Sequence, residues 1–178
     1  MTRPAARLTL ISHAMTDAMS AGRFPLDEPL SDIGRRQASP LDTDARALAG
    51  PELRTRQTAE LLDLRACIEP GLADLDCGGW RGRALHDLSP AELETWLTDP
   101  GQAPHGGESI GGLVERVARW LAQTGDGGRT VAVTHPAVIR AAILVALDAP
   151  PTSFWRIDVA PVSHTVLHRR DGGWTLRL

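Results

Sequence analysis

Short apolar runs bounded by turn residues alternate along this chain with longer stretches of helical period, and no other feature narrows the possible folds as much. Leu8–Ile11 and Thr130–Thr134 are apolar or β-branched and are typical of buried strands, with Ala45–Leu48 as a weaker third candidate. Alternating strands and helices favour a three-layer α/β/α fold with a mostly parallel central sheet. In such sheets, sites lie beyond the carboxyl ends of the strands.

Capping residues mark where helices begin and end. Ser89–Glu92 is a capping box with proline at the first helical position. Ser109 can cap a later helix that Gly125 ends, and Pro136 opens a final helix that Pro150 follows. Together with the apolar spacing, these signals predict helices over Leu53–Leu64, Ala91–Leu97, Ile110–Gln123 and Val138–Leu147.

The last part of the chain changes character. Ile157–Val159, Val162–Arg169 and Trp174–Leu178 alternate in polarity, which predicts strands, and Asp171–Gly173 is a turn sequence between the last two. These strands would form a late antiparallel edge of the sheet. No internal repeat appears, and 178 residues suffice for one well-buried core, so we expect a single domain over residues 1–178.

Charge and cysteine content exclude several classes of function. A net charge of −3 argues against nucleic acid and anionic membrane surfaces as partners. The first apolar run, Leu8–Ile11, is too short for a signal peptide or a membrane span. Cys67 and Cys77 form neither a disulfide framework nor a CxxC metal pair, so we expect a cytoplasmic protein with no metal and no cofactor. All 19 basic residues are arginine, so any anion site depends on arginine, histidine and backbone N–H groups.

Two histidines occupy matching places in the predicted sheet. His13 ends the first strand and His135 ends the strand over Thr130–Thr134, so both should project from the carboxyl edge. Neutral imidazole is a competent nucleophile toward phosphorus. Pro136 and Ala137 open a helix directly behind His135, and the free N–H groups of a helix start favour an anion there.

Five segments, in their order and spacing, then point to a known family. They are 27–38 (DEPLSDIGRRQA), 53–60 (LRTRQTAE), 75–82 (LDCGGWRG), 106–109 (GGES) and 133–140 (VTHPAVIR). From Leu8 to Leu178 the chain resembles the histidine phosphatase superfamily, in its phosphoglycerate mutase-like branch. Segment 53–60 is similar to the family pattern L-x-R-A-x-Q-T-A-E, with one residue fewer before the arginine.

The resemblance implies a role for each matching side chain. His13 would be the nucleophile that accepts the phosphoryl group, while His135 and Arg54 would bind the transferring phosphate. Asp74 stands where the family usually has the glutamate that protonates the leaving oxygen, with Asp76 and Glu108 as alternative acids. The substrate-binding candidates around this set are Ser12, Thr16, Arg23, Glu108 and Arg140. Trp80 and Trp96 either pack in the core or line the mouth of the site.

One departure from the family pattern concerns the nucleophile's neighbours. The family's Arg-His-Gly is here Ser12-His13-Ala14, so the arginine that grips the phosphate is missing. Loss of one charge-assisted hydrogen bond costs about 1.5–3 kcal/mol, or roughly ten- to a hundredfold in rate or affinity. Ala14 in place of glycine requires that this position avoid positive φ. Met19 occupies the spacing at which the family has an asparagine.

Two functions follow from these observations. The first is a metal-independent hydrolase of small phosphomonoesters that acts through a phosphohistidine on His13. The second is a weak or inactive pseudophosphatase that uses the same pocket to bind a phosphorylated ligand or a protein partner. A mutase is the less favoured enzyme, because family mutases carry longer insertions over the site than the short stretch Cys77–Pro104. The sequence carries no signal for an oligomeric state.

Overall fold

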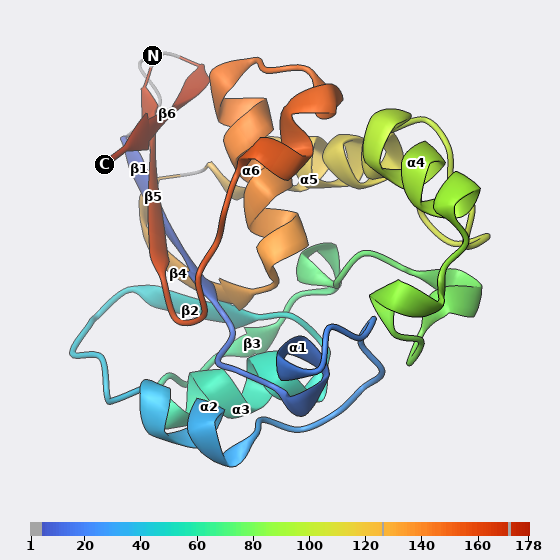
Figure 1. The fold of residues 1–178 in the computed structure, drawn as a ribbon. Coiled ribbons are helices and arrows are strands. Elements are labelled where there is room, and N and C mark those ends of the chain that lie inside the picture. Colours follow the sequence, from blue (N-terminus) through green and yellow to red (C-terminus); the bar gives the residue numbers. More distant parts are fainter. Residues whose placement is uncertain (1–4, 126, 171) are drawn as a thin grey trace.

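The computed structural model describes residues 5–125, 127–170 and 172–178, and its centre is a mixed six-stranded sheet (Figure 1). Along the sheet the strands follow the order β3-β2-β4-β1-β5-β6. Their bounds are β1 (Ala6–Ser12), β2 (Arg46–Ala49), β3 (Cys67–Ile68), β4 (Gly128–Thr134), β5 (His164–Arg170) and β6 (Gly173–Arg177). The strands predicted first, β1 and β4, lie side by side at its centre.

Strand direction divides the sheet into two parts. β1, β2, β3 and β4 run parallel to one another, whereas β5 pairs antiparallel with both β1 and β6. This confirms a mostly parallel sheet with a late antiparallel edge. The register pairs Ser12 with Thr134, and the His13 N–H donates to the Thr134 carbonyl at 2.9 Å. His13 and His135 therefore leave the sheet side by side, as their positions in the sequence predicted.

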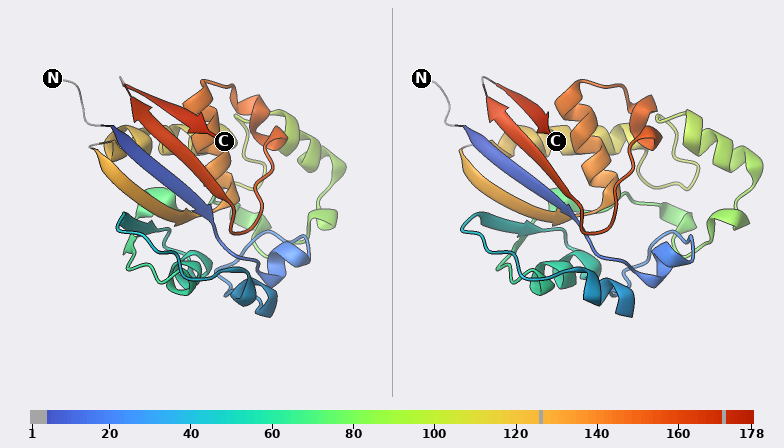
Figure 2. Two further views of the ribbon diagram at one scale, coloured as in Figure 1. Left: turned by 90° about the vertical axis from the view of Figure 1, so that its left-hand side faces the viewer. Right: turned by 60° about the vertical axis from the view of Figure 1, so that its left-hand side comes forward.

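Helices cover the sheet on both faces. They are α1 (Asp17–Ser20), α2 (Asp32–Gln37), α3 (Leu53–Leu61), α4 (Pro90–Thr98), α5 (Ile110–Thr124) and α6 (Pro136–Leu147). α5 and α6 pack together on one face, and α2 and α3 lie on the other (Figures 1 and 2). The predicted caps are present, since Ser89 Oγ accepts from the Glu92 N–H at 3.3 Å and Ser109 Oγ accepts from the Gly112 N–H at 3.0 Å.

Alternation along the strands splits the core into two clusters. On the α5–α6 side, buried side chains of the sheet meet those of the helices, including Leu8, Leu10, Leu113, Val117, Ile139 and Leu144. The smaller cluster lies beneath α3 and consists of Ile11, Ala49, Ala59, Leu62, Val131 and Val133. β1 is thus buried on both faces near its end, which holds the following loop in a fixed place.

The structure differs from the prediction in several elements, and the short helices α1 and α2 were not predicted. Ile157–Val159 forms no strand; instead, Ile157 ends the 3₁₀ helix η4 (Pro151–Arg156), where its N–H donates to the Phe154 carbonyl at 3.4 Å. β3 was not predicted, because two exposed residues carry no periodicity. Asp171 of the predicted turn lies outside the described residues. Within the described ranges, no helix has both the length and the apolar character needed to cross a membrane.

Candidate active site

The loop after β1 is held by side chains from the segments that carry the family resemblance. The Ala14 N–H donates to Thr58 Oγ1 at 2.9 Å, and the Met15 N–H donates to Gln37 Oε1 at 2.9 Å. A Cβ on Gly34 would collide with the Met15 carbonyl, so only glycine at this position lets α2 pack this closely against the loop after β1. Ala14 is not among the described non-glycine residues with positive φ, as its side chain requires.

His13 is fixed in one tautomer by its neighbour. Its Nδ1 lies 2.7 Å from the Ala14 carbonyl oxygen. Because a carbonyl can only accept, Nδ1 carries the proton and Nε2 keeps its lone pair. Burial, followed by the charge of His135, lowers the pKa of His13 to about 3, so the ring is neutral at pH 7. The side chain lines a cavity, and a neutral imidazole with a free Nε2 has the form that a nucleophile needs.

His135 lies between two carboxylates. Its Nε2 is 2.7 Å from Glu52 Oε2, and its Nδ1 is 3.4 Å from Asp74 Oδ2. The ring is fully buried, with its centroid 5.2 Å from that of His13. Gly50 makes the Glu52 contact possible, since a Cβ there would lie 3.2 Å from both His135 Nε2 and Glu52 Oε2. The sequence predicted that His135 contacts a phosphate, whereas in the structure its Nε2 contacts the Glu52 carboxylate.

Arg54 and Asp74 form a buried ion pair beside the histidines. Arg54 Nη2 donates to Asp74 Oδ2 at 2.6 Å, and Nη1 donates to the Leu26 carbonyl at 3.0 Å. Burial favours the protonated form of Asp74, but the charges of His135 and Arg54 outweigh it and lower its pKa. The pKa of Glu52 is lowered as well, because the hydrogen bond and charge of His135 outweigh its burial. Both side chains are carboxylates at neutral pH.

The side chains expected to bind phosphate already have carboxylate partners before any ligand binds. Arg54 faces Asp74, and His135 faces Glu52. A phosphate dianion must therefore compete with two carboxylates for the groups that were expected to receive it. Glu52 was missed by the sequence analysis, although it stands two residues before Arg54, where the family pattern has leucine if it is aligned on the arginine without a gap. That substitution is the one local signal that could have revealed it.

Glu108 binds an arginine next to the site and not the site itself. Arg116 Nε and Nη2 each donate to its carboxylate at 2.8 Å. The same guanidinium donates to the carbonyls of Gly71 at 3.1 Å, Ala73 at 3.0 Å and Asp74 at 3.3 Å. Glu108 thus fixes the arginine that holds the segment carrying Asp74, and it lines neither of the two cavities at Arg54.

The structure brings five of the predicted residues to one cavity and leaves others aside. His13, Thr16, Arg54, Asp74 and Arg140 line the same cavity. Of the remaining candidates, Ser12 is fully buried and its Oγ has no hydrogen-bond partner among the described residues. Arg23 is exposed, and its Nη1 donates to the Gly82 carbonyl at 3.3 Å, away from this cavity.

A second cavity lies on the other side of Arg54 and is lined by Glu52, Asp74 and Asp76 among others. Asp76 is exposed, and its Oδ1 accepts from the Gly78 N–H at 2.9 Å. Cys77 lines both cavities, but burial raises its pKa to about 12, so its thiol stays protonated and is no nucleophile. Over the ranges that the structure describes, no group of three or more His, Cys, Asp or Glu side chains is placed to hold a metal ion.

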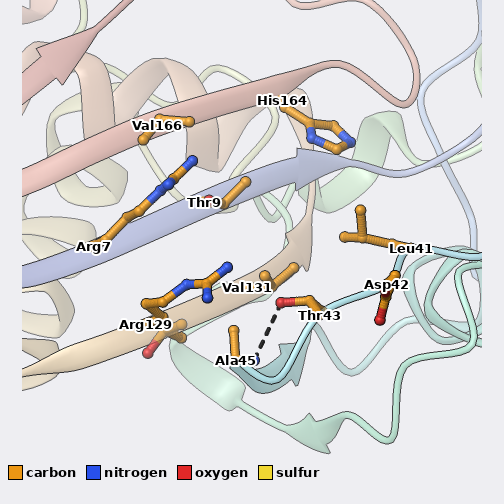
Figure 3. A pocket seen from close by; sticks show the side chains of 11 residues that line it. Arg7, Thr9, Leu41, Asp42, Thr43, Ala45, Arg129, Val131, His164 and Val166 are labelled. Carbon is orange, nitrogen blue, oxygen red and sulfur yellow. Dashed lines mark hydrogen bonds between the residues drawn. The ribbon is translucent and has the colours of Figure 1, made fainter.

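A third hollow lies on the open part of the sheet, over β4, β1 and β5 (Figure 3). Arg7, Arg129 and His164 line it, and Arg129 pairs with Asp44 at 2.8 Å. It shares no lining residue with the two cavities at Arg54. The histidine pair and the buried carboxylates therefore lie outside it.

Comparisons with known proteins concern the family and the fold of this chain. The family model for the histidine phosphatase superfamily (branch 1) matches residues 8–178. A curated protein of Mycobacterium tuberculosis described as bifunctional is 26% identical over 193 residues, covering 97% of this chain and 53% of that protein. The chain thus spans about half the length of this relative. The glucosyl-3-phosphoglycerate phosphatase of Mycolicibacterium vanbaalenii is 29% identical over 177 residues, covering 85% of this chain and 78% of that protein.

Solved structures show the same fold. A mutant phosphoserine phosphatase from Entamoeba histolytica, in complex with phosphoserine, has a TM-score of 0.85 at 22% identity, covering 97% of this chain and 95% of that one. A mycobacterial glucosyl-3-phosphoglycerate phosphatase has a TM-score of 0.79 at 23% identity, covering 98% of each chain. With a family model that matches almost its whole length, the chain belongs to the histidine phosphatase superfamily, branch 1.

Proposed function

We propose that this chain is a metal-independent phosphomonoester hydrolase that acts through a phosphohistidine on His13. The observation that carries the proposal is the state of the His13 ring, which is neutral, with Nδ1–H held by the Ala14 carbonyl and with Nε2 free. Its substrate is a small phosphorylated compound. Cys67 and Cys77 are both free thiols, which supports a cytoplasmic location.

In the first half of the reaction, His13 Nε2 attacks phosphorus. The N–P bond forms while the bond from phosphorus to the alcohol oxygen breaks. Arg54, which lines the cavity, stabilises the negative charge on the phosphoryl oxygens. Pro136 and Ala137, at the start of α6, line the same cavity, so the first-turn N–H groups add to this stabilisation. In the second half, water attacks phosphorus and the N–P bond breaks.

Asp74 supplies and recovers the proton. In the empty site it is a carboxylate held by Arg54. A phosphate dianion both competes for Arg54 and repels the carboxylate, and each effect raises the pKa of a neighbouring acid. Substrate binding therefore favours the protonated form of Asp74, which gives its proton to the leaving oxygen. The carboxylate so formed takes a proton from the attacking water. When phosphate leaves, Asp74 releases this proton to solvent and pairs with Arg54 again, which returns the site to its starting state.

A second candidate function is supported by Ser12 and Glu52. The serine replaces the family's phosphate-binding arginine, and the glutamate adds a carboxylate against His135. Together they make the site less positive by two formal charges than a site with arginine and leucine at these positions. A pocket altered in this way can bind a phosphorylated ligand or a partner weakly without turning it over. This is the pseudophosphatase hypothesis.

Hydrolysis of p-nitrophenyl phosphate in excess chelator tests the proposal. The parent should turn the ester over without added metal, and His13→Asn should abolish turnover, because no neighbouring group can replace the phosphohistidine. His86→Asn is the matched control, since that side chain is 81% exposed. Thermal unfolding of each variant shows whether the fold is intact. A parent that binds vanadate without hydrolysing the ester supports the pseudophosphatase. Activity in His13→Asn within a few-fold of the parent overturns the mechanism.

A further inference from the structure

The cavity at His13 has a polar floor and an apolar mouth. Its floor holds the charged groups described above. Its mouth is formed mainly by aromatic and aliphatic side chains from α1, the loop after it, the segment that follows Asp74, α4 and η4, namely Met19, Phe24, Leu75, Trp96, Phe154 and Trp155. Trp80, the other tryptophan singled out from the sequence, is buried behind this wall and does not line the cavity.

The aromatic side chains form one continuous wall. The ring centroids of Phe24 and Trp96 are 5.3 Å apart, those of Trp96 and Trp155 are 4.3 Å apart, and those of Phe154 and Trp155 are 4.8 Å apart. Trp96 and Trp155 are only partly buried, so parts of their rings stay open to the cavity. Three separate chain segments are thus packed together to present aromatic surface next to the nucleophile.

The few polar groups of the mouth do not favour a second charge on the substrate. Arg140 is the cation there; its guanidinium stacks 5.6 Å from the ring centroids of Phe154 and Trp155, and its Nε donates to the Ile157 carbonyl at 2.7 Å. Glu28 lines the same cavity, and neither of its carboxylate oxygens has a partner among the described residues. One cation and one carboxylate cancel, so a second charge on the substrate gains little there. Glu28 can accept a hydrogen bond from one hydroxyl, but most of the remaining surface is aromatic and favours a ring that stacks on it.

We propose that the alcohol part of the substrate is aromatic, so that the site takes monophosphate esters of aryl or arylmethyl alcohols. This inference rests on the proposed function, because it assigns the mouth to the leaving group of the ester that His13 attacks. With the phosphoryl group at His13, the alcohol extends along the wall of Phe24, Trp96 and Trp155. Each aromatic contact contributes about two- to tenfold in binding.

Calorimetric titration with two non-hydrolysable phosphonates tests the inference without requiring turnover. Benzylphosphonate should bind the parent at least about tenfold more tightly than 2-hydroxyethylphosphonate. Trp96→Leu, which keeps the site apolar, should reduce this ratio several-fold, and so should Trp155→Leu if the first variant does not fold. Trp174→Leu is the matched control, because that ring packs against the α5 side with its Nε1 donating to the Leu121 carbonyl, away from the cavity.

The outcomes separate this inference from the proposed function. Preferential binding of benzylphosphonate, with no hydrolysis of phenyl phosphate, supports the aromatic site and overturns the hydrolase. Equal affinity for the two phosphonates, or a ratio unchanged in the folded tryptophan variants, overturns the aromatic site even if phenyl phosphate is hydrolysed. Failure of the folded parent to bind either phosphonate overturns it too.

Discussion

The ion pair between Arg54 and Asp74 should account for a measurable part of the stability of this protein. The Arg54 side chain is 3% exposed and that of Asp74 is 18% exposed, with 2.6 Å between Nη2 and Oδ2. Two unit charges about 4 Å apart interact by about 4 kcal/mol at an effective dielectric of 20. Removal of one partner of such a pair typically costs about 3–5 kcal/mol, because the other charge stays buried without compensation.

A double-mutant cycle isolates this interaction. We expect Arg54→Met and Asp74→Asn each to lower the free energy of unfolding by about 3 kcal/mol or more. The double variant removes both charges, so no unpaired charge stays buried. The loss of unfolding free energy in the double variant should therefore be about 2–3 kcal/mol smaller than the sum of the losses in the two single variants. Urea denaturation at pH 7 gives the four values. Arg56→Met is the control; that side chain is exposed on the same helix, and its loss should change stability by less than about 0.5 kcal/mol. If the losses in the two single variants add up to the loss in the double variant to within about 0.5 kcal/mol, the two side chains do not interact and the reasoning is refuted.

Three further predictions concern charge at the site. The pKa of His13 falls from 6.5 to about 3 on folding, so the unfolded chain binds a proton that the folded one does not, and stability drops by about 2 kcal/mol from pH 7 to pH 5. His13→Asn should lack this loss in urea denaturation. Glu52→Gln should strengthen phosphate binding about tenfold in calorimetry, because the site loses the carboxylate that competes with phosphate at His135. Arg23→Ala should leave phosphate affinity unchanged, since its guanidinium lies on the Gly82 carbonyl.

Each of these has a contradicting outcome. If His13→Asn loses as much stability as the parent between pH 7 and pH 5, the ring is not held neutral by burial. Weaker phosphate binding in Glu52→Gln would show that the glutamate supports the anion site instead of competing with the ligand. Glu60→Gln, an exposed acid on the same helix, is its control. A loss of affinity of tenfold or more in Arg23→Ala would mean that this arginine replaces the one missing before His13.

The sheet centre and the capped helices could be predicted because local rules determine them. β1 and β4 are apolar runs long enough to be recognised, and Ser89 and Ser109 mark helix starts by side-chain chemistry alone. For the opposite reason, β3 was missed and the segment Ile157–Val159 was wrongly predicted to be a strand. A strand of two exposed residues has no pattern of its own, and an alternating segment becomes a strand only where a free sheet edge is in reach.

The candidate site was predictable only in part. His13 and His135 follow strands, and strand ends meet at one edge, so their pairing follows from topology. The contact of Glu52 with His135 joins residues 83 positions apart, and it depends on the room that Gly50 leaves. Likewise, Glu108 acts through Arg116, which no motif singled out. Side-chain partners of this kind are set by tertiary packing and leave no periodicity in the sequence.

Rapid-quench trapping of the phosphoenzyme tests the central claim most directly. The parent is mixed with phosphate-labelled phenyl phosphate, quenched in alkali, which preserves phosphohistidine, and digested with trypsin. The account predicts alkali-stable, acid-labile label on the tryptic peptide Leu8–Arg23, which contains His13 as its only histidine, and none in His13→Asn. Hydrolysis of the ester at the parent rate in His13→Asn, or label found on another peptide, would contradict it.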